Sequence, residues 1–122
     1  MPRVMGFSLQ VLYAPLNFRE VTQTVRLDRG TNYYQVGGVY RVWWKPRSVK
    51  SGHPIGLVRT LAIERKTIDE LTEEDAVRGG FQGPNALKKL RETLLYWHDY
   101  SDTGFLVIKF EWLEEEKDEL KR

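Results

Sequence analysis

Hydrophobic side chains recur at every second position in several stretches of the chain, and this is the period of a half-buried β-strand. The alternation predicts strands at residues 4–12, 22–27, 39–44, 55–63 and 104–113. In the second strand, Thr22, Thr24 and Arg26 share one face. In the fourth, Arg59 interrupts the apolar face, so we expect it to pair inside the protein or to face a cavity. In the last strand, four large apolar residues share a side, namely Leu106, Ile108, Phe110 and Trp112.

Three helices are predicted by other signals. Pro15 permits a short helix over residues 16–21. Thr72 is a suitable N-cap for a second short helix, which a pair of glycines ends. Pro84 begins a third helix. The apolar stripe of that helix consists of Leu87, Leu90, Leu94 and Trp97. Clusters of turn-forming residues predict loops at 28–38 and 45–54.

Many strands with few crossovers favour an α+β fold, namely a small, mostly antiparallel β-barrel of about five strands with flanking short helices. The chain has 122 residues, which suits one hydrophobic core. We therefore expect a single domain over residues 1–113. Residues 114–122 form a charged C-terminal tail.

Composition excludes several kinds of site. The chain has no cysteine, so it forms no disulfide and no cysteine-ligated zinc site. Its two histidines, His53 and His98, are far apart in the sequence, and we expect neither a metal site nor a cofactor. No apolar run is long enough to cross a bilayer, and the first residues do not read as a secretory signal. We expect a cytoplasmic protein without membrane contact.

Charge is divided unevenly along the chain. Residues 1–66 carry 11 Lys and Arg against 3 Asp and Glu, whereas residues 67–122 carry 8 against 14. In one compact domain this division predicts a basic face, which attracts phosphate groups, although it is also compatible with a dipolar surface of no functional consequence. The segment from Thr22 to Arg47 combines cations with aromatic rings, a mixture that suits RNA or a nucleotide.

The candidate ligand-binding residues lie in this segment and just after it. They are Thr22, Thr24, Arg26, Arg29, Tyr33, Tyr34, Arg41, Trp43, Trp44, Lys45, Arg47 and Lys50. Arg26 can clamp a phosphate or a base edge, or it can pair with a carboxylate. Tyr33 and Tyr34 lie in a glycine-rich loop, where exposed rings can stack on unpaired bases. Trp43 and Trp44 are strand neighbours, so one is expected in the core and the other partly accessible.

Five segments together resemble an ASCH domain, a member of the PUA-like superfamily. They are TQTVR, VGGVYRVWW, IDELTEEDAVRGGF, ALKKLRETLLYW and VIKFEWL, and the resemblance covers residues 4–113. It implies a small β-barrel with flanking helices and a cleft beside the motif strand. Family members are associated with RNA binding, coactivator-like roles, ribonuclease action and amide hydrolysis of an acetylated cytidine.

The resemblance also shows where this chain departs from the family. The threonines and the arginine of the family's Lys-Thr-x-Thr-x-Arg strand are present, but its lysine falls on Val21. The glutamate of the family's Glu-Gly-Phe turn falls on Gly79. In amidohydrolase-type members this lysine and glutamate work with the threonine, here Thr24. Glu64 or Glu74 could replace the missing base. The family's Gly-Asp turn falls on Gly37 and Gly38, which removes another acid.

Three functions remain as hypotheses. The first is a non-catalytic domain that recognises RNA or a nucleotide in a basic cleft. The second is an enzyme acting on RNA or a modified nucleoside, a ribonuclease or an amidohydrolase, with Thr24, Tyr33 or Tyr34 and Lys45 as its chemical groups. The third is a protein-interaction module that uses the acidic second half. The missing lysine and glutamate favour the first.

Overall fold

The structure is a computed structural model that describes residues 3–7, 15, 19–30, 32–45, 52–97 and 104–114. Its elements, in chain order, are β1 (Arg3–Phe7), β2 (Gln23–Leu27), β3 (Val39–Trp44), β4 (His53–Lys66), the 3-10 helix η2 (Ile68–Glu70), α2 (Glu73–Arg78), α3 (Ala86–Trp97) and β5 (Phe105–Leu113). The end of the first predicted strand, residues 16–18 of the helix predicted at 16–21, and residues 115–122 of the predicted tail lie outside the described residues. Residues 19–21 of that predicted helix are described and are not helical.

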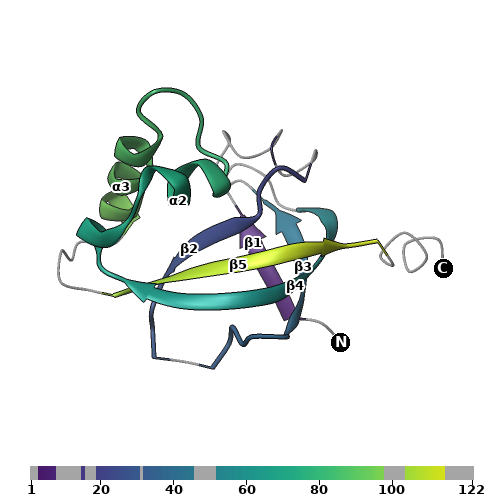
Figure 1. Cartoon of the computed structure of the whole chain (residues 1–122). Coiled ribbons are helices and arrows are strands. Elements are labelled where there is room, and N and C mark those ends of the chain that lie inside the picture. The colour runs from purple at the N-terminus through teal and green to yellow at the C-terminus, as the bar shows by residue number, and fades with distance from the viewer. Residues whose placement is uncertain are drawn as a thin grey trace.

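The five strands form one mixed sheet in the order β1-β3-β4-β5-β2. β1 pairs with β3 in parallel, and the other three pairs are antiparallel. The sheet curls into a half-barrel, and both helices lie on one side of it, next to β2 and β5 (Figure 1). The predicted α+β class and the mostly antiparallel five-stranded barrel are confirmed.

The curled sheet encloses the first of two hydrophobic clusters. It contains residues from β1, β3, β4 and β5 and from the segment just before β2. Its buried members are Met5, Phe7, Val21, Tyr40, Val42, Trp44, Val58, Ile108 and Phe110. Leu106 and Trp112 pack against it, so the predicted side of β5 does face the barrel interior.

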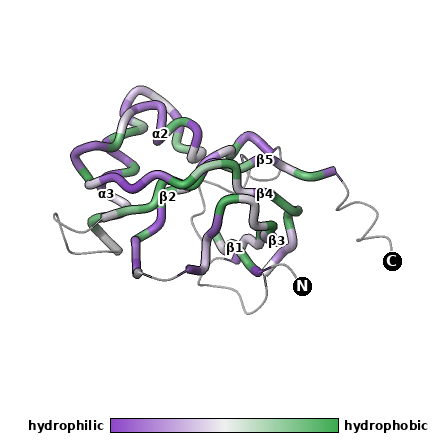
Figure 2. The backbone as a smooth tube through the Cα atoms, turned by 60° about the horizontal axis from the view of Figure 1, so that its bottom comes forward, coloured by the Kyte–Doolittle hydropathy of each residue, from purple (hydrophilic) through white to green (hydrophobic). Residues whose placement is uncertain are grey.

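The second cluster lies between the helices and the outer surface of β2 and β5. On β5, Phe105 and Val107 alternate with the residues of the barrel core and belong to this cluster. Leu90 and Leu94 are its buried contribution from α3, and Leu87 packs against them, as the helical stripe predicted. Figure 2 shows hydrophilic and hydrophobic residues mixed along the helices and the strands, as expected for elements that have one buried face.

The prediction for Arg59 is wrong. Arg59 lies on the outer face of the sheet, where its guanidinium pairs with Glu111 at 3.7 Å and both side chains are 48% exposed. The residues that face the core are instead Val58 and Thr60. The pairing of β4 with β5 shifts between Thr60 and Ala62, so the strand contains a bulge at this point. A bulge reverses the faces of all residues beyond it, which simple alternation cannot show.

The ends of α2 follow the predicted signals. The Thr72 side chain accepts a hydrogen bond from the Asp75 amide, as an N-cap does. At the other end, the amide of Gly80 donates to Val77 and that of Phe81 donates to Ala76. This is the Schellman pattern, and it requires the left-handed backbone that Gly80 adopts with φ of 99°. Phe81 thereby turns into the second cluster.

A buried polar network joins α2 to the sheet. The two Asp75 carboxylate oxygens accept hydrogen bonds from Gln23 Nε2 at 2.7 Å, Lys66 Nζ at 2.9 Å and the Thr72 amide at 3.0 Å. Burial alone raises the pKa of Asp75, but these hydrogen bonds outweigh it and hold the pKa below its ordinary value. The network therefore connects β2, β4 and α2 through one ionised carboxylate.

We expect Asp75→Asn to lower the free energy of unfolding at pH 7 by about 2–4 kcal/mol, because it leaves Lys66 without its buried partner. The folded-state pKa of Asp75 is depressed, so its stabilising contribution is present above the unfolded pKa of about 4 and disappears as the pH falls through the folded pKa. Chemical denaturation between pH 2 and pH 7 should show a weaker acid dependence in the variant.

The matched control for this substitution is Glu74→Gln. Glu74 is the neighbouring carboxylate on α2, is 66% exposed and pairs on the surface with Arg78. Because exposed pairs contribute little, we expect its loss to change stability by less than about 1 kcal/mol. Equal effects of the two substitutions would contradict a central role for Asp75.

Candidate functional site

β2 presents different chemistry on its two faces. On one face, Val25 and Leu27 pack against the helix-side cluster, and Gln23 hydrogen-bonds to Asp75. On the other, Thr24 is buried and Arg26 reaches across to the barrel residues. The predicted common face of Thr24 and Arg26 therefore points into the half-barrel.

The side chain of Arg26 lies where the two edges of the sheet approach each other. β2 is one edge strand and β1 is the other. The Arg26 Cζ atom is 4.6 Å from the centroid of the Phe7 ring on β1 and 6.0 Å from that of Tyr34. Its Nε donates a hydrogen bond to Thr24 Oγ1 at 3.1 Å. We call Phe7, Thr24, Arg26 and Tyr34 the Arg26 site.

No carboxylate among the described residues pairs with Arg26. Its single hydrogen bond within that part of the chain goes to Thr24, which leaves most of its five N–H donors available. Burial lowers the pKa of Arg26, and the neighbouring Tyr34 and Tyr33 partly offset this effect. An arginine remains charged even so. A partly buried cation without a protein anion is a suitable site for an anionic ligand.

Three tyrosines, Tyr33, Tyr34 and Tyr40, pack against one another beside Arg26. Tyr33 and Tyr34 meet edge to face with centroids 4.9 Å apart, and Tyr40 lies 5.2 Å from Tyr34. The Tyr40 hydroxyl donates to the Tyr33 carbonyl and accepts from the Gln35 amide, which fixes the loop onto the barrel. Burial raises the pKa of Tyr34, although the nearby Arg26 charge opposes the rise. The Tyr34 phenol is therefore a neutral hydrogen-bonding group at pH 7.

The predicted exposure of Tyr33 and Tyr34 is corrected by these contacts. Both rings are partly buried and pack against the barrel core instead of projecting from the loop. Arg3 lies over the Tyr33 ring at 5.0 Å from its centroid. The rings are drawn inward because the open end of the half-barrel needs apolar filling. They line the Arg26 site, but they do not form an exposed stacking platform.

The remaining predicted residues separate into different regions. Trp44 is in the barrel core, whereas Trp43 is partly buried on the opposite face of β3, so the prediction of one core tryptophan is confirmed. Arg41 shares the outer face with Trp43. The side chains of Thr22, Arg29 and Lys45 are exposed. Arg47 and Lys50 lie outside the described residues.

Val21, Gly79 and Gly38 occupy positions where the resembled family carries polar groups. In this chain all three lie in close contact with their surroundings. Val21 is completely buried in the barrel core, and its carbonyl accepts a hydrogen bond from Trp112 Nε1 at 2.8 Å. A Cβ atom on Gly79 would lie 3.2 Å from the Asp75 carbonyl, which is tighter than ordinary contact. A Cβ on Gly38 would lie 2.9 Å from the Tyr40 hydroxyl, so an acidic residue does not fit there without movement.

Neither proposed replacement base is placed beside Thr24. Glu74 pairs with Arg78 on the exposed side of α2, and Glu64 is exposed on β4. Within the described ranges, the Thr24 hydroxyl has a hydrogen bond only from Arg26, and none joins the Lys45 side chain to Thr24 or Tyr33. Among the described residues there is also no group of three potential metal ligands. The helices in those ranges are too short or too polar to cross a membrane.

Two contributors were not among the predicted site residues. Phe7 lies on β1, a strand that the alternation predicted. It contacts Arg26 on β2, which is the strand at the opposite edge of the sheet. Asp75 fixes Gln23, the immediate neighbour of Thr24. Asp75 lies in the first turn of the helix that Thr72 was predicted to cap, but the capping pattern does not indicate its contact with Gln23.

The fold is similar to those of two solved structures. The chain matches the ASCH domain from Lactobacillus crispatus JV V101 with a TM-score of 0.63 and 19% identity, over 81% of this chain and 69% of the other. It matches a protein from Enterococcus faecalis V583, assigned to the family model DUF984, with a TM-score of 0.61 and 14% identity, over 93% and 82% of the two chains. No protein-family model matches the sequence, and no curated protein matches it. At these identities the likeness confirms the fold that the sequence resemblance implied.

We expect Arg26→Met to leave the unliganded protein equally stable or to raise its free energy of unfolding by up to about 2 kcal/mol. The flexible apolar side chain keeps contact with Phe7 while removing a partly buried charge that lacks a carboxylate partner among the described residues. Urea denaturation at low and at high salt measures the change.

Arg91→Met is the matched control. Arg91 on α3 donates to the carbonyl oxygens of Ile68, Asp69 and Leu71, so its loss leaves these carbonyls without their partner. We expect this variant to be less stable by about 1–2 kcal/mol. A destabilised Arg26→Met protein would show that the guanidinium charge itself, and not only the packing of this side chain on Phe7, stabilises the unliganded fold.

Proposed function

We propose that this chain is an RNA-binding domain of the ASCH family that holds RNA or a nucleotide through the Arg26 site without catalysing a reaction. The observation that carries the proposal is the partly buried Arg26 guanidinium, which has aromatic neighbours and no carboxylate partner among the described residues. A guanidinium in such a place binds a phosphate in bidentate fashion or donates to a base edge. The proposal includes a cytoplasmic location.

The surroundings of Arg26 support an anionic ligand. The nearest acidic residue along the chain, Asp28, already pairs with Arg65 at 3.4 Å. Arg29 is exposed in the turn that follows β2, and Arg3 is exposed beside Tyr33. Positive charges without competing carboxylates raise the local concentration of phosphate groups. The basic cleft remains part of the proposal.

The absence of catalysis is supported by the environment of Thr24. A threonine hydroxyl becomes a nucleophile only when a base removes its proton. Here the hydroxyl accepts a hydrogen bond from a cation, and the family positions for lysine and glutamate are Val21 and Gly79. Recognition of a ligand by Arg26 needs neither group.

We expect the protein to bind a fluorescein-labelled single-stranded RNA in a salt-dependent manner, and Arg26→Met to weaken this binding by about 10-fold to 100-fold at low salt, as loss of a charged hydrogen bond predicts. Loss of one phosphate contact should also reduce the slope of log K against log salt by about 0.7. Fluorescence anisotropy from 20 to 300 mM salt measures both quantities.

Arg59→Gln is the control for the loss of one positive charge. Arg59 lies on the outer face of β4, where it pairs with Glu111. We expect this variant to bind RNA nearly as well as the parent protein, because a distant exposed charge is screened. Equal losses of RNA affinity in Arg26→Met and Arg59→Gln would indicate a general effect of charge instead of a specific contact with Arg26. The absence of RNA affinity at 20 mM salt would refute the proposal.

We also expect no turnover of labelled RNA or of acetylated cytidine by the purified protein, with or without Mg²⁺, Mn²⁺ or Zn²⁺, because no described residue provides a base for Thr24. Chromatography of the nucleoside and gel analysis of the RNA over several hours give the measurement. A turnover that persists through purification and disappears in Thr24→Val would establish an enzyme instead.

A further inference from the structure

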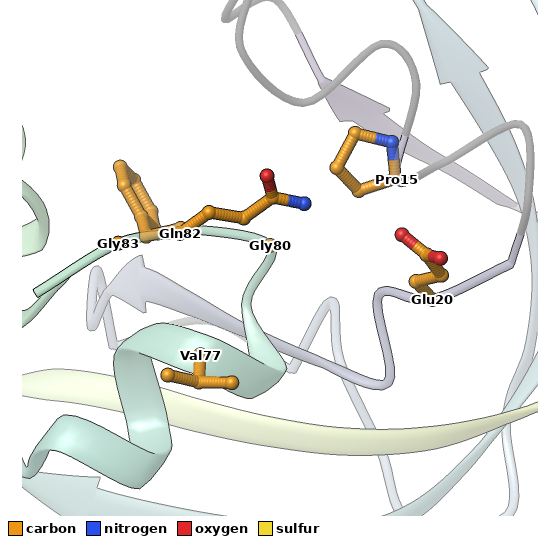
Figure 3. A pocket seen from close by; sticks show the side chains of 7 residues that line it. Pro15, Glu20, Val77, Gly80, Gln82 and Gly83 are labelled. Atoms are coloured by element: carbon orange, nitrogen blue, oxygen red, sulfur yellow. The ribbon is translucent and has the colours of Figure 1, made fainter.

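A second recess lies close to the beginning of β2 and contains no member of the Arg26 site. It has a volume of about 330 Å³, and its lining comes from the chain before β2, from α2 and from the turn that follows α2. Figure 3 shows Glu20 and Pro15 on one side and Gln82 on the other, with Val77 on α2. This size is near the lower end of ligand pockets, so it fits a small group or one side chain.

The lining is apolar apart from two side chains. Pro15, Val77 and Phe81 provide hydrocarbon surface. Glu20 contributes a carboxylate and Gln82 a carboxamide, which points toward the side that carries Pro15 and Glu20 (Figure 3). Among the described residues, Glu20 is the single charged member of the lining, and it has no ion-pair partner in that part of the chain. The recess therefore presents one negative charge and one amide against apolar walls.

Local backbone contacts hold the two polar residues in position. The Glu20 amide donates to the Pro15 carbonyl at 2.8 Å on one side of the recess. On the other side, Lys89 Nζ donates to the Gln82 carbonyl at 2.9 Å. Gly80, in its left-handed conformation, directs the chain out of α2 and into this turn. These contacts fix the backbone on the two sides of the recess, from which the exposed side chains of Glu20 and Gln82 extend.

We propose that this recess binds an arginine side chain presented by a partner protein. A guanidinium is planar and weakly hydrated, donates to a carboxylate in bidentate fashion and has N–H groups left for a carboxamide oxygen. The apolar walls suit its aliphatic stem. A lysine ammonium is more strongly hydrated and uses neither feature as well. Inside the lining, the Glu20 carboxylate disfavours a phosphate.

This partner site is independent of the proposed RNA binding, and its test does not require RNA. We would titrate ¹⁵N-labelled protein with a blocked glycine–arginine–glycine tripeptide and follow the backbone amides of Gly80 and Gly83, which line the recess. We expect saturable shifts, and we expect the citrulline tripeptide, which has the same shape without the charge, to bind about tenfold more weakly.

Glu20→Gln should weaken binding of the arginine tripeptide by about tenfold, and Gln82→Ala should weaken it by a smaller factor. Both side chains are exposed, so the variants are expected to fold, and their amide spectra check this. Glu64→Gln removes the same charge from an exposed strand residue and should bind like the parent protein. Arg26→Met should also bind the tripeptide normally.

The proposal is overturned if the citrulline tripeptide binds as well as the arginine tripeptide, or if Glu20→Gln binds like the parent. It is also overturned if guanosine monophosphate shifts the Gly80 and Gly83 amides while the arginine tripeptide does not. Arg26→Met changes the proposed RNA site and leaves the recess unchanged. The tripeptide titration therefore tests the recess even if the protein binds no RNA.

Discussion

The contact between the Arg26 guanidinium and the Phe7 ring closes this half-barrel where backbone hydrogen bonds do not. β1 and β2 are the free edges of a five-stranded sheet, so the space between them has to be filled by side chains. Phe7 enters from one edge, Arg26 from the other, and Tyr34 from the loop before β3. Closure by an arginine places a permanent charge among rings, which is costly unless an anion arrives. The location of Arg26 between the two edge strands therefore accounts for both its structural role and its proposed functional role.

β2 can carry this charge because its other face is fixed independently. Gln23 is bound to Asp75, and Asp75, in the first turn of α2, is bound to Lys66 and to the N-cap residue Thr72. The strand is also hydrogen-bonded along its length to β5. With register and position determined from the helix side, the inward residues do not have to contribute all the stability of the strand. This separation is common at binding sites, where polar groups are left unpaired at the expense of stability.

The sequence predicted most elements but not how distant residues meet. The strand at 39–44 has the predicted bounds, because its neighbouring loops are rich in turn formers, and Thr72 caps α2 as expected. The face of Arg59 was wrong because the bulge near Leu61 has no glycine or proline to mark it. The contact of Arg26 with Phe7 joins the two sheet edges and exists only after the sheet curls. Tyr33 and Tyr34 were expected at the surface since loops usually are exposed, but the open barrel end draws them inward.

The packing around Val21 and Gly79 explains why a single substitution at either position would not introduce the catalytic groups of the amidohydrolase type. Val21 fills the barrel core, and its carbonyl anchors the Trp112 indole, over which Arg19 is stacked. A lysine there would bury an ammonium in an apolar cluster. Gly79 is the C-cap of α2, where a longer side chain begins in close contact with the Asp75 carbonyl. Both positions now serve the fold. What remains on β2 is a positioned cation, Arg26. The proposed ligand recognition requires this cation and does not require the lysine or the glutamate.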